Sequence, residues 1–121
     1  MKNYHAHIYF DVNQQDEASQ LQRKISAHFL NKKIAVSRLV NRPIGPHPKP
    51  MFEVDFFVTE HAEVVEFITK NIGTLSCLVH ENTGDDVRDH SEGIQWIGPT
   101  LTLDFSFFEE ILRHPNLRIH K

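Results

Sequence analysis

The sequence predicts an α+β fold of the ferredoxin-like type, in which a βαββαβ chain forms one antiparallel sheet with two helices on one face. Three observations predict this fold. Residues 4–11 and 51–58 alternate apolar and polar side chains as strands do, two further segments repeat apolar side chains at helical spacing, and the order of the elements is that of a split βαβ pair. Residues 1–121 are expected to form a single domain.

The first half of the chain contains two expected strands and one expected helix. Residues 4–11 form the first strand, and their alternation separates Tyr4, Ala6, Ile8 and Phe10 from His5, His7 and Tyr9. A helix is expected over residues 16–31, because Asp16 and Glu17 favour a helix N-terminus. The β-branched residues of 34–40 indicate a second strand, and the four prolines of 41–50 indicate a loop.

The second half is expected to complete the sheet. The third strand covers residues 51–58, a helix over 61–72 ends at Gly73, and the fourth strand covers 74–80. A polar segment, 81–93, precedes a fifth, edge strand at 101–105 and a short helix at 106–113. The expected strand order is fourth, first, third, second. Asp85, Asp86 and Asp89 lack calcium-loop spacing and are interpreted as a solvated turn.

Composition excludes several classes of function. The net charge is −3 without a basic stripe, so nucleic acid is not an expected partner. Apolar stretches are far shorter than the ~20 residues that span a bilayer, and no signal-peptide pattern is evident, so a cytoplasmic protein is expected. Cys77 is the single cysteine, which leaves histidines and carboxylates as metal ligands. The nine histidines predict sensitivity to pH near ~6.5.

The sheet face that points away from the two helices is expected to carry the chemistry. Its polar residues include His5, His7, Glu53 and His80. A His-x-His pair on a strand places two imidazoles on one side, and an antiparallel fourth strand would bring His80 beside His5. Together with Glu53, these histidines form a candidate metal site of the facial type that suits Fe(II).

Two observations argue against this interpretation or restrict it. Histidines on an exposed sheet face are commonly solvated or lie in a dimer interface, and no chemistry is expected of His28, His61, His114 and His120. His47 precedes the third strand, so it should lie roughly 20 Å from His80 at ~3.3 Å per residue. Both could bind one metal only if the proline-rich loop folds back or a second subunit contributes.

A series of ordered motifs resembles the DOPA 4,5-dioxygenase family. The motifs are YHAHIYFD at 4–11, GPHP at 45–48, LVH at 78–80 with NTGD at 82–85, DH at 89–90 and WIG at 96–98. The resemblance extends from about residue 4 to residue 103. It implies a ferredoxin-like homodimer that opens the ring of a catechol such as DOPA, using O₂ and non-haem Fe(II), with zinc or another divalent metal as an alternative.

The resemblance also implies roles for particular residues. The histidine set of the family maps onto His5, His7, His47, His80 and His90. We expect extradiol cleavage in which His47 or His90 accepts and returns protons, while Tyr9 and Trp96 stack on the substrate ring. Glu81 is a departure, because proline is expected at this position. The alternative function is a dimer that binds a small aromatic ligand or a metal without turnover.

Overall fold

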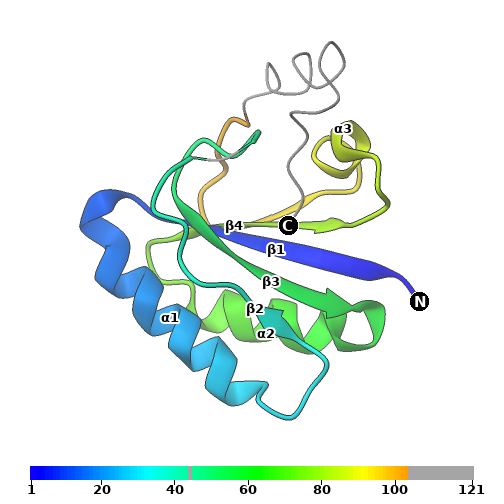
Figure 1. The fold of residues 1–121 in the computed structure, drawn as a ribbon, viewed down its shortest axis with the longest axis horizontal. Helices are drawn as coiled ribbons and strands as arrows, with labels where there is room; N and C mark the ends of the chain where they lie inside the picture. The colour runs from blue at the N-terminus through cyan, green and yellow to red at the C-terminus, as the bar shows by residue number, and fades with distance from the viewer. Residues whose placement is uncertain (44, 104–121) are drawn as a thin grey trace.

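The computed structural model describes residues 1–43 and 45–103, and their backbone forms one antiparallel sheet with helices on both sides (Figure 1). Single 3₁₀ turns precede α1 and α2. The elements are β1 (Asn3–Tyr9), α1 (Gln15–His28), β2 (Ala35–Val36), β3 (Met51–Phe57), α2 (His61–Asn71), β4 (Ser76–Glu81), α3 (Asp86–Asp89) and β5 (Gln95–Ile97).

The strand order is β2-β3-β1-β4-β5, and every neighbouring pair is antiparallel. The predicted order of the first four strands is therefore confirmed. β1 lies at the centre, where His7 pairs with Glu53 of β3 and His5 pairs with His80 of β4. Paired residues project to the same face of a sheet, so this register gathers these side chains on one face.

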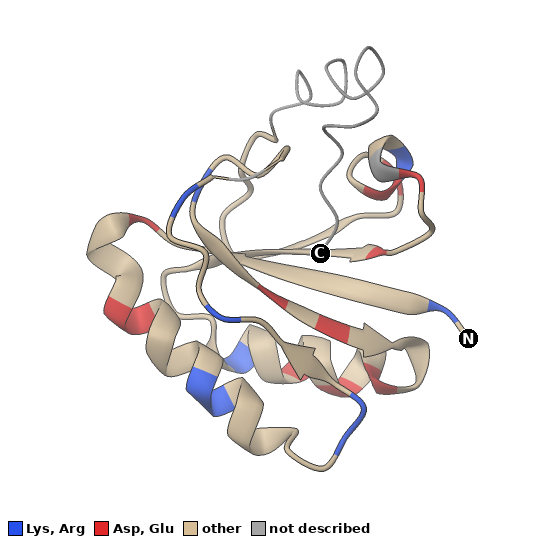
Figure 2. Cartoon of the chain, viewed as in Figure 1, with Lys and Arg blue, Asp and Glu red and all other residues tan. Residues whose placement is uncertain are grey.

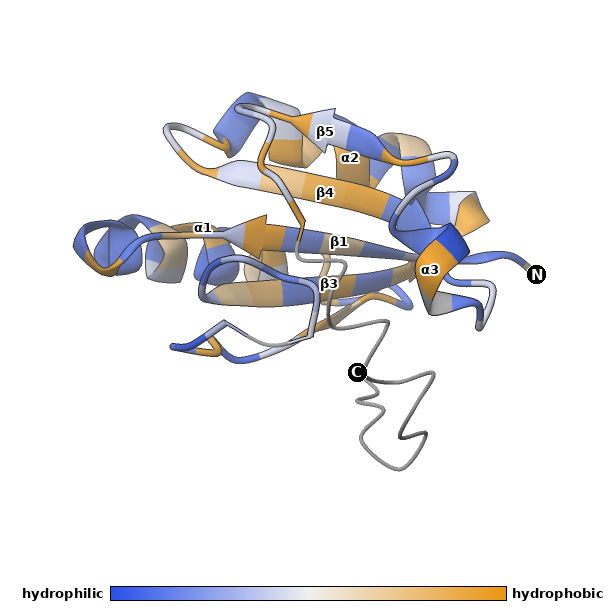
Figure 3. Cartoon of the chain, turned by 90° about the horizontal axis from the view of Figure 1, so that it is seen from above, coloured by the Kyte–Doolittle hydropathy of each residue, from blue (hydrophilic) through white to orange (hydrophobic). Residues whose placement is uncertain are grey.

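The main core lies between the sheet and the helices α1 and α2, which cover the same face in Figure 1. Hydrophobic and hydrophilic residues alternate along β1 in Figure 3, as the sequence predicts. Gly73 follows α2 with a φ of 58°, as expected at a helix C-terminus. The buried residues of this core include Ala6, Ile8, Phe10, Leu21, Ile25, Phe52, Val54, Phe56, Val64, Ile68 and Cys77. Burial raises the pKa of the Cys77 thiol.

The opposite sheet face is covered rather than open, which corrects the expectation of an exposed polar face. A second apolar cluster of Tyr9, Met51, Leu78 and Leu103 lies there, with Ile94, Trp96 and Leu101 packed against it. The chain that follows β4 therefore folds back over the sheet. As a result, the five histidines of the predicted site are buried, none of them more than 8% exposed.

The second and fifth strands differ most from their predicted bounds, whereas the ends of the other three strands shift by no more than two residues. The fifth strand is Gln95–Ile97 rather than 101–105; residues 101–103 have no regular structure, and residues 104–121, with the predicted helix, lie outside the described part. β2 is limited to Ala35–Val36, followed by an isolated bridge between Val40 and Met51. The Ser37 hydroxyl accepts the Glu53 backbone N–H at 2.8 Å, which replaces a ladder hydrogen bond and ends the strand.

Among the described residues, charged side chains of both signs are spread over several elements (Figure 2). Figure 2 shows acidic residues on β3 and both signs on α1 and α2. No helix within the described ranges is both long and apolar enough to cross a membrane.

We predict that Phe52→Ala lowers the free energy of unfolding by about 3–5 kcal/mol, because it leaves a cavity in the main core. Val58→Ala is the matched control, since Val58 is 42% exposed and a surface substitution changes stability by about 0.5 kcal/mol or less. Urea unfolding followed by circular dichroism measures both values. Equal losses in the two variants would contradict this assignment of the core.

Candidate metal centre

Five histidines from four segments form one buried cluster among the described residues. β1 supplies His5 and His7, β4 supplies His80, the loop before β3 supplies His47, and His90 follows α3. Ring centroids of His5 and His80 are 5.3 Å apart, which confirms that the predicted pairing brings them together. The other short separations of ring centroids are His7–His47 at 4.2 Å, His80–His90 at 4.5 Å, His7–His80 at 5.1 Å and His47–His90 at 5.3 Å.

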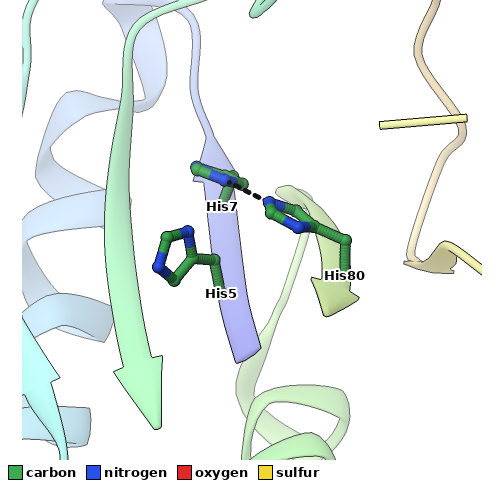
Figure 4. A group of neighbouring side chains, drawn as sticks. All are labelled: His5, His7 and His80. Carbon is green, nitrogen blue, oxygen red and sulfur yellow. Dashed lines mark hydrogen bonds between the residues drawn. The ribbon is translucent and has the colours of Figure 1, made fainter. Parts of the chain in front are cut away.

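His7 and His80 point their Nε2 atoms toward each other at 3.0 Å (Figure 4). The Nδ1–H of His80 donates to the backbone carbonyl of Glu81 at 2.9 Å, so in the neutral ring Nε2 is an acceptor. In the metal-free protein, His7 is therefore the donor of this hydrogen bond, through its Nε2–H. If a cation were ligated by both Nε2 atoms, the hydrogen of His7 would lie on Nδ1, where Met51 Sδ at 3.3 Å and Glu53 Oε1 at 3.7 Å are acceptor atoms.

His80 is held in the neutral form that metal binding requires. Burial, the largest effect, lowers the pKa of His80 to about 3, and the neighbouring His90 lowers it further. The Glu81 carbonyl acts in the opposite direction without overcoming burial. His80 therefore does not need to lose a proton to bind a metal at neutral pH.

The two acidic residues of β3 lie beside the histidines of β1. His5 Nδ1 is 3.8 Å from Glu53 Oε1, and His5 Nε2 is 3.7 Å from Asp55 Oδ2. Asn3 Nδ2 donates to Asp55, which fixes the carboxylate at this edge. Glu53 thus contacts both His5 and His7, in the position from which a carboxylate orients a ligating imidazole.

Three sets of ligand atoms within 4.8 Å of one another occur in the described part of the chain: His5–His7–His80, His7–His47–His90 and His5–Glu53–Asp55. Of the four residues that the sequence predicts as ligands, three form the first set, and Glu53 belongs to the third. His7 is shared by the two histidine sets. A metal held by either set would therefore involve His7.

The position of His47 corrects the sequence-based estimate of its distance from His80. His47 and His80 both lie against His7, with ring-centroid separations of 4.2 and 5.1 Å, and the same chain supplies all three. The loop folds back over the sheet, where Tyr9 Oη and His47 Nδ1 are 2.7 Å apart and the Phe10 N–H donates to the Pro50 carbonyl. No second subunit is needed to complete this contact.

The predicted aromatic residues lie at the edge of the cluster. Tyr9 is buried, its ring centroid is 6.1 Å from that of half-buried Trp96, and burial raises its pKa above the ordinary value of a phenol. Sequence reasoning missed the hydrogen bond between Tyr9 and His47. A tyrosine on the polar face of a strand is the signal that could have suggested it.

The burial of Asp89 corrects the expectation that it belongs to a solvated turn. It is buried rather than solvated, because the backbone N–H and hydroxyl of Thr83 both donate to its carboxylate. These bonds fix the turn that carries the adjacent His90. Two other histidines lie on the helix side of the sheet, where His28 stacks on Phe67 and His61 packs on Tyr4.

A family model and a named relative identify the same family. Residues 4–107 match the model of the Dopa 4,5-dioxygenase family. The chain is 31% identical to the DOPA 4,5-dioxygenase of Amanita muscaria, over 98% of this chain and 57% of that protein. It is 34% identical to an uncharacterized 21.2 kDa protein of Botryotinia fuckeliana, over 89% of this chain and 64% of the relative. The chain thus spans about three-fifths of the length of these two relatives.

A solved structure shares the fold. A crystal structure of a Nostoc punctiforme protein described as a "putative dioxygenase" superposes with a TM-score of 0.83. The two proteins are 34% identical, and the match covers 92% of this chain and 94% of the other. The likeness therefore extends over most of both chains.

We predict that the metal-free protein loses stability as the pH falls below about 6.5. Unfolded His80 binds a proton near ~6.5 whereas folded His80 binds one near 3, so between these values the unfolded state holds more protons. This residue contributes a decrease in the free energy of unfolding of up to about 1.4 kcal/mol per pH unit. Urea unfolding of the EDTA-treated protein at several pH values measures the slope.

The slope should become shallower in His80→Gln, whose side chain does not titrate. His28→Gln is the matched control, because His28 is exposed on α1. An unchanged slope in His80→Gln would show that other groups cause the acid sensitivity.

Proposed function

This chain belongs to the Dopa 4,5-dioxygenase family, and from that premise we propose that it cleaves the aromatic ring of a catechol such as DOPA with O₂ in an extradiol reaction. The observation that carries the proposal is the pair of Nε2 atoms of His7 and His80, 3.0 Å apart inside a buried cluster of imidazoles. Such a donor set has no role in packing the main core, which lies on the other face of the sheet.

The residues present fit the metal that this family implies. Imidazoles with a nearby carboxylate suit non-haem Fe(II), and they also accept zinc or another divalent ion. His5, His7 and His80 would hold the ion, since their ligand atoms lie within 4.8 Å of one another and all three side chains are buried. When bound, Fe(II) would hold both catechol oxygens, lower their pKa and activate O₂.

The chain itself supplies the remaining functions. Glu53 contacts His5 and His7 and would orient both rings. His47 or His90 would receive the protons that the catechol hydroxyls release, because both rings adjoin His7. Trp96 packs against the second apolar cluster and would form, with Tyr9, the wall on which the substrate ring stacks.

The family resemblance also supports a homodimer, although the histidine cluster forms within one chain. The proposal therefore predicts that dimer formation and metal binding are separable. Light scattering of the metal-free and the metal-loaded protein would measure dimer formation independently of metal binding.

We predict that His7→Ala loses most of its bound metal, because His7 belongs to both histidine sets. Comparison of His5→Ala with His47→Ala identifies the set that holds the ion: the former should lose metal and the latter should retain it. Glu53→Gln should weaken metal affinity by roughly 10–100-fold, the usual effect of removing an orienting partner. Metal is measured by mass spectrometry of protein purified without a histidine tag.

His28→Ala is the matched control for these variants, since His28 stacks on Phe67 far from the cluster. Unchanged metal content in His7→Ala would refute the assignment of ligands to β1.

We predict that the Fe(II) protein consumes O₂ with a catechol and forms a yellow ring-opened semialdehyde. His47→Ala and His90→Ala are expected to retain catechol binding, and the variant that removes the proton carrier should slow ring opening by roughly 10²–10⁴-fold. An oxygen electrode measures the consumption of O₂, and absorption spectroscopy measures the formation of the semialdehyde. Tight binding of catechols without O₂ consumption by the wild type would favour a binding protein instead.

A further inference from the structure

We propose that Tyr9 is a positioning residue that donates its hydroxyl hydrogen to His47 Nδ1 and thereby holds His47 as the neutral tautomer with its hydrogen on Nε2. This assignment makes His47 a hydrogen-bond donor through Nε2 rather than a metal ligand or a proton carrier. The consequence of this assignment for catalysis rests on the proposed function, whereas the assignment of the His47 tautomer does not rest on it.

The geometry of the pair is well defined. Tyr9 Oη and His47 Nδ1 are 2.7 Å apart, at the short end of the normal range, and the two residues are 1% and 2% exposed. The Tyr9 ring belongs to the second apolar cluster, in which it packs with Met51 and Leu78. Because Tyr9 ends β1, the strand that carries His5 and His7 also fixes the hydroxyl.

The direction of the hydrogen bond follows from the number of hydrogens. His47 is the hydrogen-bond partner of the Tyr9 hydroxyl among the residues that the structure describes. A buried hydroxyl that does not donate leaves a costly unsatisfied hydrogen, so Tyr9 donates and His47 Nδ1 accepts. A neutral imidazole carries one N–H and accepts at its other nitrogen, which places the hydrogen of His47 on Nε2.

The same reasoning separates the two overlapping histidine sets. If His47 ligated a metal through Nε2, its hydrogen would move to Nδ1, and Tyr9 would have to accept there and lose the acceptor for its own hydrogen. His5 and His80 have no such conflict with Tyr9. The pair therefore favours His5–His7–His80 as the ligand set and excludes His47 from it.

The tautomer also restricts what His47 can do. A neutral imidazole gives up its remaining N–H hydrogen with difficulty, but it stabilises an oxygen that gains negative charge by donating a hydrogen bond. Proton transfer in the proposed reaction would then fall to His90, whose ring centroid is 5.3 Å from that of His47.

The test is ¹⁵N-histidine NMR of the metal-free and the zinc-loaded protein. His47 signals are assigned by their absence in His47→Gln. In the wild type we expect a His47 ring with a bare Nδ1 and a protonated Nε2. A protonated Nδ1 of His47 would overturn the proposal. This measurement uses the wild type and does not depend on the folding of Tyr9→Phe. In Tyr9→Phe the hydrogen should move at least partly to Nδ1, and an unchanged pattern would also overturn it.

Tyr4→Phe is the matched control, because it removes the hydroxyl of the only other tyrosine, which packs on the helix side against Phe56. It should leave the His47 signals unchanged, and a change as large as that in Tyr9→Phe would count against a specific role of Tyr9. Zinc content should be unaffected in both tyrosine variants; loss of zinc in Tyr9→Phe would overturn the exclusion of His47 from the ligand set.

Activity then separates this proposal from the proposed function. With Fe(II) bound, Tyr9→Phe should lower kcat roughly tenfold at nearly constant KM, a smaller loss than that of a general acid or base. A rise in KM without a fall in kcat would overturn the positioning role. If the wild type shows the expected tautomer but opens no catechol ring, the proposed function fails while the assignment of Tyr9 and His47 holds.

Discussion

The antiparallel register of β1 between β3 and β4 determines which side chains can meet in this protein. It places His5 opposite His80 and His7 opposite Glu53, while Ala6 and Ile8 face the two helices. A slip of one residue in either pairing would move the histidines into the apolar core and the apolar side chains onto the site. The core and the candidate metal centre thus depend on the same pairing.

Coverage of the second sheet face changes what the histidines can do. On an exposed face, imidazoles would titrate near their ordinary pKa and exchange with water. Here Leu78, Met51 and Leu103 form an apolar cluster beside them, and burial keeps His80 neutral across the physiological range of pH. Neutral, positioned ring nitrogens reduce the reorganisation that metal binding requires.

The sequence predicted long strands with a clear alternation better than short strands and loop contacts. The alternation of β1 and β3 predicted both faces of the sheet and the meeting of His5 with His80, because a period of two leaves no freedom in side-chain direction. The three-residue strand at Trp96 was too short to be recognised by periodicity. The positions of His47 and Asp89 depend on loop contacts with Tyr9 and Thr83, which no local pattern encodes.

The single cysteine has a chemical consequence for a protein proposed to handle catechols and O₂. Catechols oxidise readily to quinones, which are electrophiles that add to thiolates. Cys77 is completely buried on the helix side of β4, and burial raises its pKa, so it presents neither an accessible sulfur nor a thiolate. The described part of the chain therefore lacks a reactive thiol, and by-products of its proposed substrate have no cysteine to arylate there.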